Sequence, residues 1–209
     1  MKGILSMLRG NKKEDNGEDR LDSMMFSTAF AGLGVDANLL VPWEARAVEV
    51  GATRVSGSRG TKLLQQLWAK DKYMRMLEKD SISKLERYFD YALVPANRDV
   101  IRQDEYGNFM VVVLSGSVAV DRQQPWGERL RLAEAVPGDI LGEMSLLDSG
   151  MRFSVCTTLS VCEIGILGAE AMDEMLNHEP TLAASLIALL ARKLSLRLRV
   201  VSARLSEQR

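Results

Sequence analysis

The sequence predicts an α+β fold, in which a β-rich middle is flanked by helical regions on both sides. Short apolar runs, separated by turn signals at close to ten-residue spacing, fill residues 92–167 and are typical of a small antiparallel sandwich or barrel. Apolar residues recur at three- and four-residue steps in residues 61–90 and 169–205, which indicates amphipathic helices. The 209 residues are enough for one domain with an appendage.

The amino-acid composition argues against several classes of function. The chain has 27 Lys plus Arg against 28 Asp plus Glu, so any electrostatic recognition must be local. Two cysteines and one histidine argue against a disulfide framework and a Cys/His zinc site. No apolar run reaches the roughly 18 residues of a membrane span, and we identify no export signal. We therefore expect a cytoplasmic protein without a membrane span.

The N-terminal part divides by composition. In residues 9–22, nine of fourteen residues are charged, so residues 1–22 are predicted to be a flexible segment. Residues 23–60 form an extension to which the sequence assigns no fold, with a glycine- and serine-rich linker at residues 56–60. Met24, Met25, Phe26 and Phe30 belong either to a small docking element or to the helical subdomain.

The elements after Gly60 follow in order. Two helices are expected in residues 61–90; Leu64 and Trp68 lie in the apolar stripe of the first, and Asp80 or Ser81 caps the second, at 82–88. The predicted strands span 100–101, 109–114, 117–120, 130–135, 154–158 and 161–167, with a two-residue strand at 140–141. Helices follow at 169–178 and from 181 to about 204, and Pro180 separates them.

Residues 137–154 have the pattern of an anion cradle. A tight Pro-Gly-Asp turn and a short strand lead to Gly142, where the backbone can approach a ligand closely. The helical turn that follows presents free N–H groups with partial positive charge. Arg152 comes nine residues after Glu143 and can add a forked cationic contact, while Glu143 is an acceptor suited to a sugar hydroxyl.

This stretch resembles the phosphate-binding cassette of the cyclic-nucleotide-binding domain, the β-roll shared by catabolite activator proteins, kinase regulatory subunits and gated channels. Residues 101–116 likewise resemble the family's strand, turn and strand leading to its glycine, and Pro137-Gly138-Asp139 resembles its turn before the cassette. The resemblance covers roughly residues 82–204. It implies a domain over residues 61–205, with an antiparallel, jelly-roll-like β-roll at 92–167, N-terminal helices at 61–90 and helices at 169–205.

The resemblance also implies a ligand and its site. In the family, the residue that matches Glu143 accepts from the ribose 2′-hydroxyl, and the one that matches Arg152 pairs with the cyclic phosphate. The implied ligand is a cyclic nucleotide such as cAMP or cGMP, with no metal and no other cofactor. The implied ligand-binding residues are Gly142, Glu143, Met144, Ser145, Arg152, Phe153 and Ser154.

Two features of the cassette leave alternatives open. Phe153 stands where the family prefers Ala, Ser or Thr, so its ring must point away or fill part of the site. Arg152 and Glu143 can also be a surface ion pair on a roll that has lost its ligand.

The last helix carries a long apolar stripe. A helix of about 24 residues is roughly 36 Å long, more than a roll of this size can cover, which favours a parallel homodimer along its outer half. The alternative is that the stripe simply packs on the roll. The predicted dimerisation residues are Leu186, Leu190, Leu194, Leu198 and Val201. Basic residues in the same region are expected to be a solvated face rather than a nucleic-acid site.

We therefore expect a regulatory sensor, not an enzyme, that passes ligand-induced helix movement to a partner protein. In the family's transcription factors a helix-turn-helix domain follows the long helix; here the sequence ends directly after it, which suggests a stand-alone member without that domain. The alternative function is a ligand-free module for protein contacts. A cupin-like enzyme is disfavoured because one histidine cannot build its metal centre.

Overall fold

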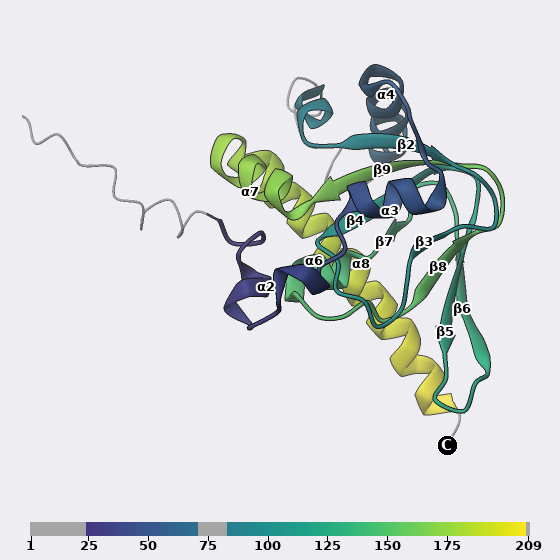
Figure 1. The fold of residues 1–209 in the computed structure, drawn as a ribbon. Helices are drawn as coiled ribbons and strands as arrows, with labels where there is room; N and C mark the ends of the chain where they lie inside the picture. The colour runs from purple at the N-terminus through teal and green to yellow at the C-terminus, as the bar shows by residue number, and fades with distance from the viewer. Residues whose placement is uncertain (1–23, 71–82, 208–209) are drawn as a thin grey trace, which may run out of the picture.

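The computed structural model describes residues 24–70 and 83–207, and its centre is a roll of two antiparallel sheets (Figure 1). The strand order is β1-β2-β9-β4-β7 in the first sheet and β3-β8-β5-β6 in the second. The strands are β1 (Thr53–Arg54), β2 (Asp90–Val94), β3 (Asp99–Ile101), β4 (Phe109–Ser115), β5 (Val118–Gln123), β6 (Arg129–Ala135), β7 (Ile140–Leu141), β8 (Val155–Thr158) and β9 (Cys162–Gly168). The predicted α+β class is confirmed.

Helices cover the outside of the first sheet and cross the molecule beside it. Figure 1 shows the long helix α8 passing α6 and continuing well beyond it. The helices are α2 (Ala29–Gly32), α3 (Trp43–Val50), α4 (Gly57–Trp68), α6 (Glu143–Asp148), α7 (Ala169–His178) and α8 (Pro180–Glu207), with 3-10 turns η1 (Ala37–Leu39) and η3 (Lys84–Arg87). None of the helices in the described residues is long and apolar enough to cross a bilayer.

Strand β4 separates two apolar cores because both of its faces are buried. Met110 and Val112 pack with α4, α7 and α8, whereas Val111 and Val113 point between the two sheets. All four side chains are fully buried. Since burying such a side chain contributes roughly 1.5–3 kcal/mol, this continuous apolar run is a central source of stability.

The structure bears out most of the predicted elements. The expected helices at 169–178 and 181–204 are α7 and α8, and α8 begins at Pro180, whose fixed φ and missing N–H suit a first helical turn. The predicted strands correspond to β3 through β9 in order. Leu64 and Trp68 are buried on α4, as their spacing predicts. Strand β2 was not expected, and it pairs along its whole length with β9.

Two predictions in the N-terminal half are wrong. Residues 56–60, expected to be a linker, are the N-cap and first turn of α4. Gly60 is a packing position rather than a linker glycine, because it lies against the ring of Tyr91 with no room for a Cβ. The helix expected at 82–88 is, at 84–87, only the 3-10 turn η3 before β2. The predicted cap at Asp80 or Ser81 and the predicted flexible segment 1–22 lie outside the described residues.

The extension at 23–60 is folded onto the domain, although the sequence assigned it no fold. Backbone N–H groups of Phe26 and Ser27 donate to the carboxylate of Asp173 on α7, at 2.8 and 2.9 Å. Phe26 belongs to the apolar core between the helices and the first sheet. Of the four apolar residues in this segment, Phe26 therefore packs with the helical part of the molecule and Phe30 is buried, whereas Met24 and Met25 are exposed.

Candidate functional site

The cassette begins at a turn that is fixed to β4. Gly138 has φ +97°, and its N–H donates to the carbonyl of Val113 at 2.8 Å, while the N–H of Val113 donates to the carbonyl of Asp139 at 2.9 Å. Strand β7 then pairs with β4 and ends at Gly142, whose φ of +75° starts α6. A left-handed conformation at this point favours glycine, because other residues pay a steric cost there.

Arg152 lies under the cassette with its side chain turned inward. Its residue is 3% exposed. Its Nη1 donates to the carbonyl of Gly142 at 2.7 Å and its Nη2 to the carbonyl of Phe109 at 2.6 Å. The guanidinium carbon lies 4.6 Å from the centre of the Phe109 ring, within the range of a cation–π contact. The structure therefore joins the start of the cassette, β4 and Arg152 in one contact set.

The backbone of Arg152 is fixed as firmly as its side chain. Its N–H donates to the carbonyl of Glu105 at 2.8 Å, and its carbonyl accepts from the N–H of Asp104 at 2.9 Å. Asp104 has φ +63°, a conformation that aspartate tolerates better than most residues. The loop between β3 and β4 thus holds both backbone groups of Arg152.

Burial removes the water that would otherwise stabilise the positive charge of Arg152. Loss of hydration lowers the pKa of its guanidinium to about 10, so the group remains charged at neutral pH. Within residues 24–70 and 83–207, no carboxylate forms an ion pair with it. Two neutral carbonyls are its hydrogen-bond acceptors, so the positive charge is only partly compensated.

Glu143 is also buried, but a cation from α8 contacts it. Its residue is 2% exposed, and burial raises the pKa of its carboxyl group against the opposing effect of Arg197. Arg197 Nη1 donates to Glu143 Oε1, and Arg197 Nη2 donates to the carbonyl of Ile140 at 2.7 Å. One turn earlier on α8, Lys193 Nζ donates to the carbonyl of Gly138 at 2.9 Å. We call Lys193 and Arg197 the α8 clamp, because they join α8 to the cassette.

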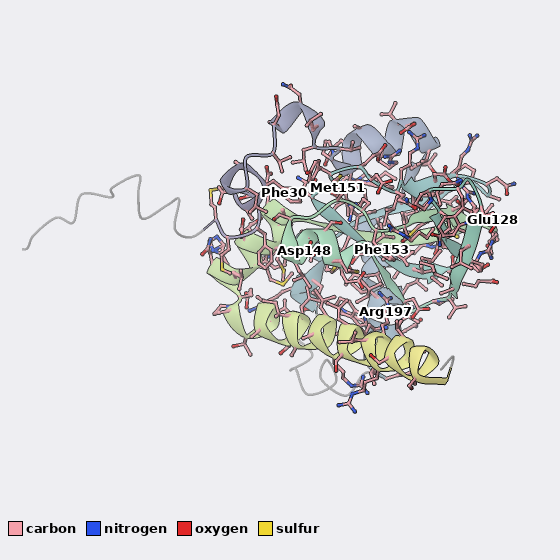
Figure 2. All side chains as sticks on the ribbon, turned by 90° about the horizontal axis from the view of Figure 1, so that it is seen from below. Phe30, Glu128, Asp148, Met151, Phe153 and Arg197 are labelled. Atoms are coloured by element: carbon pink, nitrogen blue, oxygen red, sulfur yellow. The ribbon has the colours of Figure 1, made fainter. Side chains whose placement is uncertain are left out.

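Phe153 does not fill the site. Its residue is 51% exposed, and the guanidinium of Arg122 stacks 4.1 Å from its ring centre. Met151, labelled with Phe153 in Figure 2, is also exposed. Met144 is also exposed, while Ser145 is buried and Ser154 is half-buried beside Cys156. Of the predicted site residues, Gly142 and Arg152 are thus in contact, and Glu143 and Ser145 are buried on α6. Met144 and Phe153 lie at the surface.

The site is closed in this conformation. The hollow beside Arg152, lined also by Arg46, Ile101, Tyr106 and Gly107, has no space for even a water-sized molecule. From the sequence, Lys193 and Arg197 were expected only as part of a basic surface. Their four-residue spacing, which puts both on one helix face, was the available signal. The role of Phe109 as the ring against Arg152 was not predicted.

The predicted dimerisation residues divide into two groups. Leu186 and Leu190 are fully buried in the chain's own core, so the prediction that they contact a second copy is wrong. Leu194 is half-buried, while Leu198 and Val201 are exposed at 65% and 51%. An uncovered apolar surface therefore begins only after the point where α8 leaves the core.

Comparisons with known proteins agree with this architecture. Residues 93–179, less than half of the chain, match the sequence profile of the family described as "Cyclic nucleotide-binding domain". The chain is 35% identical over 107 residues to the cyclic AMP receptor protein of Thermus thermophilus, which is 51% of this chain and 50% of that protein. It is 25% identical over 131 residues to a CRP-like cAMP-activated global transcriptional regulator of Mycobacterium tuberculosis, which is 63% of this chain and 58% of that protein.

The chain thus spans about half the length of the curated relatives that it matches. Among solved structures, a cyclic nucleotide-binding domain from Methylobacillus flagellatus aligns with a TM-score of 0.70 at 20% identity, over 76% of this chain and 89% of that one. At this identity the likeness concerns the fold. Residues 93–179 thus match the cyclic nucleotide-binding domain family in sequence profile, and the chain shares the fold of such a domain.

Proposed function

We propose that the chain is a regulatory sensor that binds a cyclic nucleotide at the cassette, with Arg152 facing the cyclic phosphate and Glu143 the ribose. The observation that carries this proposal is the buried guanidinium of Arg152 without a carboxylate partner in the described residues. The names of the two relatives, a cyclic AMP receptor and a cAMP-activated regulator, make cAMP the first ligand to test.

The electrostatic argument is that an anion completes this site. Removing a cation from water costs several kcal/mol, and two carbonyls return only part of that cost. A phosphate oxygen placed against the guanidinium would form charge-assisted hydrogen bonds, worth about 1.5–3 kcal/mol each. A chain that only needed packing at this position would gain from an apolar side chain.

Ligand binding in this proposal moves α8. The ribose hydroxyl and Arg197 compete for the same carboxylate of Glu143, so the nucleotide and the α8 clamp are alternatives. A ligand shifts such an equilibrium only by its difference in affinity for the two arrangements. Release of Arg197 would free the part of α8 beyond Leu190, which polar contacts hold to the roll.

The moved helix is the proposed output. Its exposed apolar residues, with Leu198 and Val201 among them, would form the contact with a second copy of the chain, and the released helix would be read by a partner protein. Homodimerisation and the partner are both parts of the proposal.

A second candidate is a ligand-free module for protein contacts. The closed geometry favours it, since Glu143 already has a cation and Arg152 already has two acceptors. We place this candidate second because the charge of Arg152 is only partly compensated.

Calorimetric titration separates the two. The purified chain and Arg152→Ala are each titrated with cAMP, cGMP and cyclic di-GMP. The sensor proposal expects saturable heat with one of the three, weakened tenfold to a hundredfold or more by the substitution. Absence of heat with all three would favour the ligand-free module.

A further inference from the structure

Helix α3 lies directly behind the cassette arginine, although it belongs to the extension outside the family match at 93–179. We propose that Trp43 and Arg46 of α3 are positioning residues for Arg152, so that the N-terminal extension is part of the ligand site. This inference rests on the proposed function, in which Arg152 receives the cyclic phosphate.

The first connection is a stack of aromatic rings. Trp43 contacts the ring of Phe109 edge to face, with centroids 5.7 Å apart and an interplanar angle of 68°. The same Phe109 ring lies against the guanidinium of Arg152, and its carbonyl accepts from that guanidinium. Trp43 therefore fixes the orientation of the Phe109 ring, and the guanidinium of Arg152 packs against the same ring.

The second connection is ionic and reaches the backbone of Arg152. Arg46 is 2% exposed and pairs through Nη2 with Glu105 and through Nη1 with Glu49, the latter at 2.5 Å. Glu105 is the residue whose carbonyl accepts from the N–H of Arg152. Arg102 also pairs with Glu49, so two arginines and two glutamates alternate between α3 and the loop after β3.

The loop that α3 holds approaches the guanidinium closely. A Cβ on Gly107 would lie 2.6 Å from Arg152 Nη2 and 2.8 Å from Nε, so a displacement of about 1 Å changes where the guanidinium can lie. Leu40 and Val41 add a third attachment, since Leu40 forms a parallel bridge with Tyr106 and the N–H of Val41 donates to its carbonyl at 2.9 Å. The extension thus contacts this segment at Glu105, at Tyr106 and, through Trp43, at Phe109.

The structure provides a matched control for the aromatic connection. Trp68 packs edge to face on Phe89, with centroids 5.8 Å apart and an interplanar angle of 81°, and it is buried at 2% exposure, against 9% for Trp43. This pair belongs to the core between the helices and the first sheet, which includes Ile140 and Leu146 of the cassette but not Phe109. Loss of either tryptophan should cost stability, but only loss of Trp43 should disturb the contact between Phe109 and Arg152.

The test compares Trp43→Leu, Trp43→Phe and Trp68→Leu in the full chain, by cAMP affinity and by the Nε–Hε resonance of Arg152 in NMR spectra. Trp43→Leu is expected to weaken cAMP binding about fivefold to twentyfold, less than loss of Arg152 itself. It should also shift the Arg152 resonance. Trp43→Phe should restore both values, and Trp68→Leu should change neither. Should Trp43→Leu fail to fold, Arg46→Met, which breaks the ionic connection, is measured instead.

Equal losses of affinity in Trp43→Leu and Trp68→Leu, or an Arg152 resonance that neither Trp43→Leu nor Arg46→Met shifts, would overturn the positioning role. If the unsubstituted chain binds none of the three nucleotides, the proposed function fails by itself. The Arg152 resonance of the ligand-free protein then still decides whether α3 positions the side chain.

Discussion

At the scale of single residues, the cassette depends on two buried groups of opposite charge that do not pair with each other. Arg152 donates to the carbonyls of Gly142 and Phe109, while Glu143 is contacted from the other side by Arg197. Arg152 is thereby held in place without a carboxylate partner in the described residues, whereas Glu143 already has a cation that a ligand would have to replace. Gly142, between them, allows this arrangement because a side chain there would meet Arg152 Nη1 at 2.5 Å.

A substitution at Gly142 tests this close approach. Gly142→Ala places a Cβ against Arg152 in a backbone with φ +75°, and Gly34→Ala is the control, since Gly34 has φ +76° with nothing within 4 Å. Backbone strain should cost both variants about 1–2 kcal/mol of stability, measured by denaturant unfolding, and Gly142→Ala should lose more because its Cβ also meets Arg152 and Ile101. Only Gly142→Ala should also weaken cAMP binding. Equal effects on binding would show that the approach does not matter.

The raised pKa of Glu143 gives a pH prediction. Because the folded state holds this proton to a higher pH than the usual 4.5, the folded state binds more protons, and stability falls as pH rises from about 4.5 through the raised pKa. Glu143→Gln removes this contribution. We compare the free energy of unfolding of the variant with that of the unsubstituted chain at two pH values. The difference, variant minus unsubstituted chain, should be more positive at pH 7 than at pH 4.5. An equal difference at both pH values would show that the pKa of Glu143 is not raised.

At the scale of elements, α8 has two parts with different roles. Up to Leu190 its apolar residues belong to the core, whereas Lys193 and Arg197 beyond that point make polar contacts with the cassette. Polar contacts at a half-exposed position are weak and exchange readily with other partners. The second part of α8 is therefore suited to leave the cassette when a ligand binds.

Removal of the α8 clamp should tighten ligand binding. Arg197→Gln frees Glu143 for the ribose, and since a half-exposed ion pair is worth roughly 0.5–1 kcal/mol, we expect cAMP affinity to rise about two- to fivefold. Arg199→Gln, on the exposed surface of the same helix, is the control for the loss of charge. A weaker affinity in Arg197→Gln alone would instead make Arg197 a direct contact of the nucleotide.

At the scale of the whole molecule, two sheets and their helices could be predicted from the sequence because periodicity and turn residues are local signals. The order of β3 to β9 and the last two helices followed from them. The extension could not be predicted, because its short elements are stabilised by distant groups such as Asp173 and Tyr106. In the cassette, Arg152 and Glu143 were identifiable by spacing. The spacing of Lys193 and Arg197 indicates only a shared helix face, and both Arg197 and Trp43 reach the site through tertiary packing.

Whether the chain forms a dimer should depend on the exposed apolar residues of helix α8. Leu198 and Val201 lie on the part of α8 that the core leaves exposed. Replacing both with glutamate should convert a dimer to a monomer in sedimentation experiments, because charges would replace apolar contact. Leu39→Glu, at an equally exposed apolar position in the extension, should leave the dimer intact. A monomeric unsubstituted chain would exclude the dimer.

The central claim is that the Arg152 guanidinium receives the cyclic phosphate, and the most direct measurement compares cAMP with adenosine, which lacks the phosphate. We predict that Arg152→Ala lowers the affinity for cAMP at least about tenfold and leaves the weak affinity for adenosine unchanged. Equal affinities of the unsubstituted chain and Arg152→Ala for cAMP would contradict the account.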